Sequence, residues 1–252
     1  YPGAESRGVT LFGAVLTLLV CTVIGLILPA GLAHSPKVHK GYDLYSAAVP
    51  VGLTAFFLRA VLYRVLGGTL PDGVGVGAGD GNWAVCNIFC IAVFVLALVL
   101  GLGLGGSFRQ YGELLKDSGF GADYGAKYGT GTAILNFAIY GLFIVLYYNL
   151  IGAKWNAATL GCVFCMVCCC FKGSHPANVW PIMAGYVAAA FLSAALCAAL
   201  GTDFTTAINA QAIVIGLCFA NGLSPVAGSY GWLAGVVFAK LHYGLVTSVP
   251  FT

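Results

Sequence analysis

Residues 83–105 read WAVCNIFCIAVFVLALVLGLGLG, a run of 23 residues without a charged side chain. A helix that spans the hydrocarbon core of a bilayer needs about 20 apolar residues, so this run is long enough to cross. Over all 252 residues, 60% are hydrophobic and only 8% are charged, whereas soluble domains carry roughly a quarter charged residues. No strict alternation of apolar and polar residues occurs, which argues against a transmembrane barrel. The sequence therefore predicts an all-α, polytopic transmembrane helical bundle.

Apolar runs separated by helix breakers predict about eight membrane segments. They are residues 9–33, 44–66, 83–105, 131–152, 157–171, 179–200, 207–220 and 226–249. The segments 157–171 and 207–220 are too short to span a bilayer, and each ends at a cluster of Gly, Asn and Pro residues, at 173–178 and 221–225. Interrupted segments of this kind are either re-entrant elements that line a solute path or ordinary connections between helices.

The chain is expected to form a single membrane domain over residues 1–252. The first three helices fall in residues 1–105, and the helices with interrupted segments fall in residues 131–252. Because the chain starts at Tyr1 and its last apolar run ends close to Thr252, we expect a piece of a longer protein. Lysine and arginine are enriched in alternate connections, so the positive-inside rule places residues 35–43 and 106–130 in the cytoplasm and the N-terminus outside.

Two sequence patterns that occur twice in the chain suggest an internal repeat. In the first, the pattern Cys-Phe, Gly and Pro around residues 170–176 returns around residues 218–225. In the second, Tyr128-Gly129 and Tyr140-Gly141 are matched by Tyr230-Gly231 and Tyr243-Gly244. Glycine and aromatic residues are abundant in this chain, so coincidence is the alternative to a repeat.

Polar side chains inside apolar segments are candidates for a substrate path. Burying such groups costs free energy unless they find partners on other helices or face water. Those in or near the two breaks and in segment 131–152 are Asn136, His175, Asn178, Pro181, Asn209, Asn221 and Ser224. Pro181 belongs to this set because proline removes a backbone N–H. The alternative for the amides is hydrogen bonding that only holds helices together.

Three ionisable residues lie within apolar segments, where a charge is costly and by default indicates function. Arg59 is in the middle of segment 44–66, and Lys240 and His242 are in segment 226–249. Arg59 or Lys240 would favour neutral or anionic solutes over cations. Snorkelling of the lysine to the membrane surface is the competing explanation, and His242 is the kind of residue that is often simply hydrogen-bonded.

The ten cysteines lie almost wholly in apolar runs, which does not fit a disulfide framework. Cys162, Cys165 and Cys169 share one helical face, but a second pair of ligands at metal-site spacing is missing. We therefore expect small hydrophobic residues that pack between helices, without a metal or a cofactor. Catalytic sequence motifs are absent, and the net charge of +3 does not suggest a nucleic-acid partner.

Three stretches carry a resemblance to a known family: residues 129–136, 171–183 and 222–231. They are similar to motifs of a bacterial family of polytopic membrane proteins that is catalogued as a domain of unknown function. The similarity covers about the second half of the chain and implies a multi-pass protein of the bacterial inner (plasma) membrane. The layout also resembles urea-transporter-type channels, whose Leu-Pro…Thr-x-Pro-Phe signature is absent from this sequence.

The function predicted from these features is a membrane channel or secondary transporter for a small neutral or anionic solute. Its expected partners are the lipid bilayer, the solute and further copies of the chain in a homo-oligomer. One alternative is a non-transporting scaffold or accessory subunit of a membrane complex, and another is a membrane-embedded enzyme. Transport predicts that the two breaks meet around a wet cavity, whereas a scaffold predicts a dry, packed seam.

Overall fold

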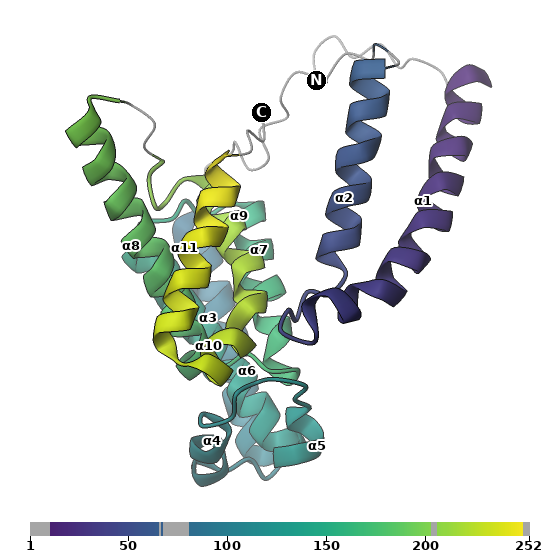
Figure 1. Ribbon diagram of the computed structural model, residues 1–252. Helices are drawn as coiled ribbons and strands as arrows, with labels where there is room; N and C mark the ends of the chain where they lie inside the picture. The colour runs from purple at the N-terminus through teal and green to yellow at the C-terminus, as the bar shows by residue number, and fades with distance from the viewer. Residues whose placement is uncertain (1–10, 66, 68–80, 203–205, 249–252) are drawn as a thin grey trace. The chain divides into compact units, whose positions relative to one another are not determined.

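The computed structural model describes residues 11–65, 67, 81–202 and 206–248, which form helices and their connections without a strand (Figure 1). These residues divide into two compact units. The first comprises the described residues within 1–40 and 45–72, and the second comprises residues 41–44 and the described residues within 73–252. The all-α prediction is confirmed for this part of the chain.

The first unit is a pair of apolar helices, α1 (Leu11–His39) and α2 (Ala48–Arg59), with a π-helical turn, η1 (Ala60–Val65), after α2. The two helices approach closely at Gly31, where a Cβ would lie 2.6 Å from the Cβ of Pro50. Most of α1 is exposed within the structure and only its Ser35 is buried, as expected for a helix that faces lipid.

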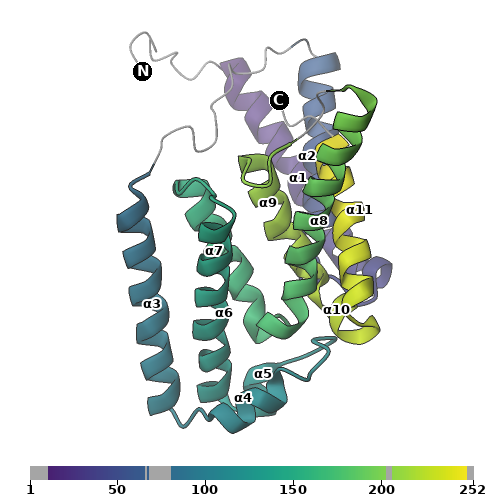
Figure 2. The same cartoon turned by 90° about the vertical axis from the view of Figure 1, so that its left-hand side faces the viewer.

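The second unit consists of three successive helical hairpins that turn at the same end of the unit (Figure 2). In the first hairpin, α3 (Trp83–Gly103) descends and α6 (Thr130–Leu150) returns, and the connection carries the short helices α4 (Phe108–Leu114) and α5 (Tyr124–Tyr128). We call this end of the unit the lower end.

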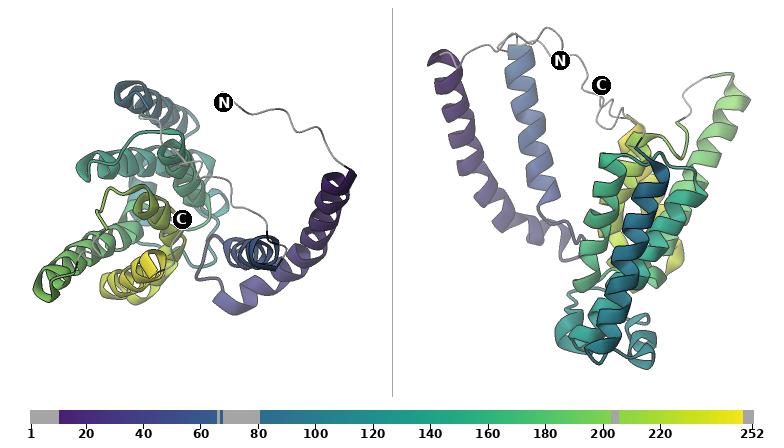
Figure 3. Two further views of the ribbon diagram at one scale, coloured as in Figure 1. Left: turned by 90° about the horizontal axis from the view of Figure 1, so that it is seen from above. Right: turned by 180° about the vertical axis from the view of Figure 1, so that it is seen from behind.

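The other two hairpins follow the same course. In the second, α7 (Ala157–Cys168) ends in a 3₁₀ turn, η2 (Cys169–Phe171), and α8 (Pro176–Leu200) returns. In the third, α9 (Gln211–Ala220), the 3₁₀ turn η3 (Asn221–Leu223) and α10 (Ser224–Tyr230) descend, and α11 (Trp232–Ser248) returns. Seen along the helices, α8 and α11 lie side by side and away from α3 (Figure 3).

Glycines let the helices of these hairpins approach one another. A Cβ on Gly101 of α3 would lie 3.0 Å from the carbonyl oxygen of Gly131 in α6, and one on Gly185 of α8 would lie 2.6 Å from the Cβ of Ala239 in α11. Small residues serve this purpose in membrane proteins, because close backbone approach replaces the hydrophobic effect as the source of packing energy.

Five helices of the described residues are long and apolar enough to cross a membrane, so the chain is a multi-pass membrane protein. They are Leu11–His39, Trp83–Gly103, Thr130–Leu150, Pro176–Leu200 and Gln211–Tyr230. The predicted count of about eight segments is not confirmed, and neither is re-entrance. Helix α7 with η2 covers about 24 Å, which is less than the roughly 30 Å of a hydrocarbon core.

The predicted segment 207–220 does not end at residues 221–225, because the helix continues through η3 and α10 to Tyr230. Pro225 falls in the first turn of α10, where the missing backbone N–H costs little. The chain reverses only at Gly231, with φ of 89° and ψ of 168°. The first break behaves differently, since the chain turns at once between Lys172 and His175.

The second repeated pattern, the Tyr-Gly pairs, also has a similar backbone conformation at its two positions. Gly129 has φ of 81° and ψ of 154°, close to the values of Gly231. Each glycine follows a short helix that ends in tyrosine and precedes the first residue of a long returning helix. Only glycine readily adopts these dihedral angles, so the Tyr-Gly pairs mark equivalent turns into α6 and α11.

Candidate functional site

A stripe of buried residues at every fourth position winds along α6. They are Thr132, Asn136, Tyr140, Ile144 and Tyr148, each at most 1% exposed. Residues four apart lie nearly above one another on a helix, so each of these side chains shares a face with the next one, and four of the five carry polar groups. Asn136 is therefore one member of a series.

The turn of the second hairpin packs against this stripe. The side-chain amide of Asn136 donates hydrogen bonds of 2.9 Å to the carbonyl oxygens of both Cys170 and Ser174. Asn178 holds the same turn from the other side, since its Oδ1 accepts from the His175 N–H and its Nδ2 donates to the Gly173 carbonyl at 2.7 Å. Backbone groups that leave helical hydrogen bonding at the break are thus satisfied by amide side chains.

The second candidate region joins the first at the level of η3. The Tyr140 hydroxyl donates to Oδ1 of Asn221, and Nδ2 of Asn221 donates to the Met166 carbonyl at 3.3 Å. The hydroxyl oxygens of Ser174 and Ser224 lie 2.9 Å apart. We call the connected set the polar column; its members are Asn136, Tyr140, Ser174, His175, Asn178, Asn221 and Ser224, whereas Thr132 donates to Gln110 at 2.9 Å.

The lower end of the polar column is covered by the connection between α4 and α5. His175 contacts the Asp117 carbonyl through Nε2 at 2.9 Å, and Tyr124 donates to the Gly173 carbonyl at 3.0 Å. Gly119 and Gly173 pack backbone against backbone, because a Cβ on either would lie within 2.3 Å of the other's carbonyl oxygen. Lys172 pairs with Asp123 at 2.8 Å, so it lies at the same end as residues 106–129.

Two members of the polar column keep a buried polar atom without a partner among the described residues: Oδ1 of Asn136 and Nδ1 of His175. Because the Asp117 carbonyl only accepts, Nε2 of neutral His175 carries the proton and Nδ1 is a bare acceptor. Buried groups of this kind are rare in proteins and require an explanation, such as a bound molecule.

An apolar layer lies above the polar column. Ile144 is one turn above Tyr140 on α6, and Leu217 is one turn above Asn221 on α9; both are fully buried in the main core. At the far end of the bundle, Asn156 donates to Gln211 at 2.7 Å and Gln211 donates to Thr159 at 3.4 Å. The polar column is therefore separated from this upper polar cluster by core side chains.

The remaining candidates lie elsewhere. Buried Pro181 packs near Gly235, Asn209 is exposed and donates to the Gly152 carbonyl, and His242 contacts the Tyr186 hydroxyl at 2.6 Å. Lys240 faces a groove between α8 and α11. Arg59 belongs to the first unit, at the end of α2.

The cysteines show no metal arrangement within the described ranges. Cys162 and Cys169 are buried and Cys165 is half-buried. Among residues 11–65, 81–202 and 206–248, no group of three or more His, Cys, Asp or Glu side chains is placed to hold a metal ion.

The model of the family described as "Protein of unknown function (DUF1576)" matches residues 105–252, which is more than half of the chain. The chain belongs to the DUF1576 family. Neither the curated proteins nor the solved structures contain a match.

The DUF1576 region begins just before α4 and contains the whole polar column. Sequence reasoning missed Tyr140, Tyr124 and the Asp117–Gly119 turn of this DUF1576 site. The spacing of four between Thr132, Asn136 and Tyr140 was the available signal for the tyrosine. The turn carried no comparable signal, because its contacts are formed by residues more than 50 positions away.

Electrostatics at the lower end of the DUF1576 site depend on Asp117. Partial burial raises the pKa of this carboxyl, but hydrogen bonds from Lys127, from the Gly119 N–H and from Tyr128 outweigh burial and hold the pKa below its ordinary value. Burial lowers the pKa of His175, although the nearby Asp117 carbonyl opposes this effect. Both groups bind protons less readily in the folded protein than in the unfolded chain.

Acidification is expected to destabilise the second unit through His175. A histidine whose pKa is lowered by folding contributes stability to the folded state. This stability is complete above the pKa of the unfolded chain, about 6.5, and is lost as the pH falls through the pKa of the folded protein. The corresponding loss for Asp117 begins only near pH 4. We expect the thermal midpoint of the solubilised protein to fall by a few degrees between pH 7.5 and pH 5, measured by tryptophan fluorescence. All four tryptophans lie in the second unit, so the signal reports this unit.

The matched variants are His175→Gln and His34→Gln. Glutamine can still donate to the Asp117 carbonyl but does not titrate, so His175→Gln should flatten the pH dependence, whereas His34 is exposed and its replacement should not. An equally steep pH dependence in the His175 variant would contradict this assignment.

Proposed function

We propose that this protein is a membrane channel or secondary transporter for a small polar solute and that the described arrangement is a closed one. The observation that carries the proposal is the polar column itself, in which both predicted breaks and the α6 stripe converge. Polar groups buried among apolar helices are costly, and transporters use interrupted helices with such groups where a substrate passes.

The two unpartnered atoms support a path rather than a purely structural seam. Oδ1 of Asn136 and Nδ1 of His175 are both acceptors, so they would suit a solute that donates hydrogen bonds. The side chains of the polar column are uncharged, and the nearest carboxylate, Asp117, is paired with Lys127. We therefore favour a neutral solute over an anionic one.

The rival proposal is a scaffold or accessory subunit. It is favoured by the dense pairing of the polar column, where most polar atoms already have protein partners. Under this proposal the amides serve as interhelical hydrogen bonds and the apolar layer is ordinary core.

A variant with a smaller side chain in the apolar layer should distinguish the transport proposal from the scaffold proposal. Leu217→Ala removes side-chain volume one turn above Asn221, so we expect a severalfold faster entry of small neutral solutes, such as urea and glycerol, into proteoliposomes. Entry is measured by light scattering after an osmotic step. Small anions such as formate should gain less.

The control for the flux experiment is Leu96→Ala, since Leu96 is a lipid-facing leucine of α3 that is 60% exposed. Tryptophan fluorescence verifies that both variants are folded. If wild type and Leu217→Ala pass every solute no faster than Leu96→Ala and protein-free vesicles, the transport proposal fails and the scaffold proposal stands.

A further inference from the structure

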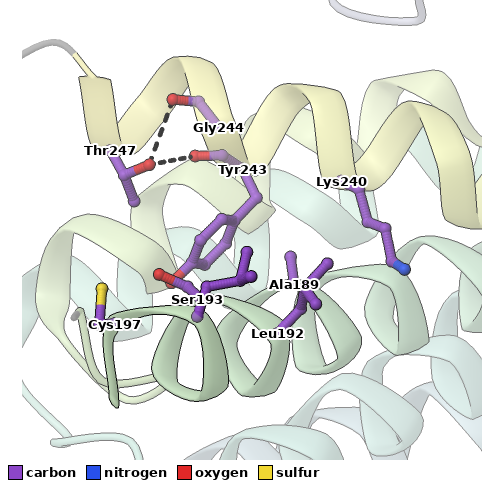
Figure 4. A pocket seen from close by; sticks show the side chains of 9 residues that line it. Ala189, Leu192, Ser193, Cys197, Lys240, Tyr243, Gly244 and Thr247 are labelled. Carbon is purple, nitrogen blue, oxygen red and sulfur yellow. Dashed lines mark hydrogen bonds between the residues drawn. The ribbon is translucent and has the colours of Figure 1, made fainter. Parts of the chain in front are cut away.

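A groove of about 340 Å³ runs between α8 and α11 (Figure 4). Lys240 and Ala189 lie at one end, Cys197 and Thr247 lie at the other, and Ser193 lies between them. The walls are mostly apolar, with Leu192 and Leu196 about half exposed. The groove is open, α8 is long and apolar enough to cross a membrane, and α11 packs along α8, so we expect the groove to face lipid.

Lys240 is the charged group of this groove. It is half-buried, lies eight residues after the start of α11, and forms no hydrogen bond or ion pair with any described residue. A lysine ammonium within an apolar segment is costly unless it reaches an anion or the membrane surface. The groove therefore has a positive charge that its own described side chains do not balance.

Ser193 is the second unsatisfied donor. Its hydroxyl has no hydrogen-bond partner among the described residues, although a serine in a membrane helix commonly bonds to the preceding turn. The other hydroxyls of the groove are satisfied, because Thr247 donates to the Tyr243 and Gly244 carbonyls and Tyr243 donates to Thr206. Of the two free donors, Lys240 lies at the end of the groove nearer the lower end, and Ser193 lies midway along it.

Two exposed tryptophans at the lower ends of the same two helices indicate the level of the membrane surface. Trp180 of α8 and Trp232 of α11 stack with ring centroids 6.4 Å apart, and they are 45% and 59% exposed. Exposed tryptophans gather at the level of lipid headgroups. Lys240 lies about 12 Å along α11 from Trp232, and an extended lysine side chain covers much of that distance.

We propose that this groove binds an anionic phospholipid. The charged, polar and apolar side chains of the groove match the phosphate, the ester groups and the acyl chains of such a lipid. The Lys240 ammonium binds the phosphate, the Ser193 hydroxyl donates to an ester carbonyl, and an acyl chain lies on Leu192 and Leu196. The leaflet in contact with the Trp180–Trp232 pair is the one predicted to be cytoplasmic, where anionic lipids attract basic side chains.

Native mass spectrometry of the full chain in detergent tests this assignment with phosphatidylglycerol and phosphatidylcholine as probes. Lys240→Met keeps the length of the side chain without the charge and should weaken phosphatidylglycerol binding about fivefold, as expected for the loss of one lysine–lipid interaction. Phosphatidylcholine binding should change less. Ser193→Phe, which fills the groove without a change of charge, should weaken both lipids.

The matched control is Lys172→Met, because Lys172 is exposed, pairs with Asp123 and lies outside the groove. Equal losses in the Lys172 and Lys240 variants would indicate only surface charge and would overturn the proposal. Unchanged phosphatidylglycerol binding in Lys240→Met would also overturn it. A Lys240-dependent interaction with oleate, in the absence of phosphatidylglycerol binding, would reject a phospholipid in favour of a free carboxylate.

Discussion

Gly173→Ala is expected to lower the thermal midpoint of the second unit by about 10 °C. Gly173 has φ of 147°, a conformation that costs other residues about 1–3 kcal/mol. An added Cβ would also lie 2.3 Å from the carbonyl oxygen of Gly119, and this neighbour is backbone that cannot rotate away. A total cost of about 3 kcal/mol corresponds to roughly 6–12 °C in a domain of this size. Tryptophan fluorescence during heating measures the change.

Gly161→Ala is the control for this substitution. Gly161 lies within α7, upstream of the same turn, and nothing lies within 4 Å of the Cβ that alanine would add. Alanine favours a helix over glycine by about 1 kcal/mol, so the midpoint should stay constant or rise slightly. A Gly173 variant that is as stable as the Gly161 variant would show that the connection between α4 and α5 does not pack against this turn.

Asn136→Leu should have the second large effect. The substitution removes the donors to the carbonyl oxygens of Cys170 and Ser174, and Asn136 is fully buried. Each carbonyl left without a partner costs about 1–3 kcal/mol, so we expect a loss of about 3 kcal/mol in unfolding free energy once the gain in apolar surface is included. Denaturant titration of the solubilised protein, followed by tryptophan fluorescence, measures this loss.

The same Asn→Leu change at Asn209 provides the comparison. Asn209 is exposed and donates to the Gly152 carbonyl at 3.2 Å, so water or headgroups can replace that bond. The expected change is within about 0.5 kcal/mol. If both variants lose the same stability, the polar column has no special part in holding the first break.

Much of the fold could be predicted from composition and spacing. Long uncharged runs such as residues 83–105 specify spanning helices because lipid offers backbone groups no alternative partner. The Gly/Asn/Pro cluster at 173–178 was correctly identified as a break, since Gly173 and Pro176 act locally on backbone conformation. Segment length was a poorer guide, because 207–220 looked too short to span a bilayer although the helix continues to Tyr230.

The candidate site could be predicted only in part. Asn136, His175, Asn178, Asn221 and Ser224 were identified one by one as polar groups in apolar surroundings, and the structure brings them together. Three other polar residues in apolar surroundings lie outside the polar column, namely Asn209, Lys240 and His242. A single polar residue in an apolar run has the same appearance whether it faces a partner helix, a groove or a loop.

The sequence by itself determined that this protein is helical, lies in a membrane and turns at particular glycines, because hydrophobicity and dihedral freedom are properties of single residues and their neighbours. Only the tertiary structure decided which polar groups meet. Gly119 and Gly173, or Ser174 and Ser224, are about 50 residues apart and come into contact through the way three hairpins pack. The run at 83–105 specifies a helix that spans the membrane, whereas the pairing of side chains inside the bundle depends on its neighbours in space.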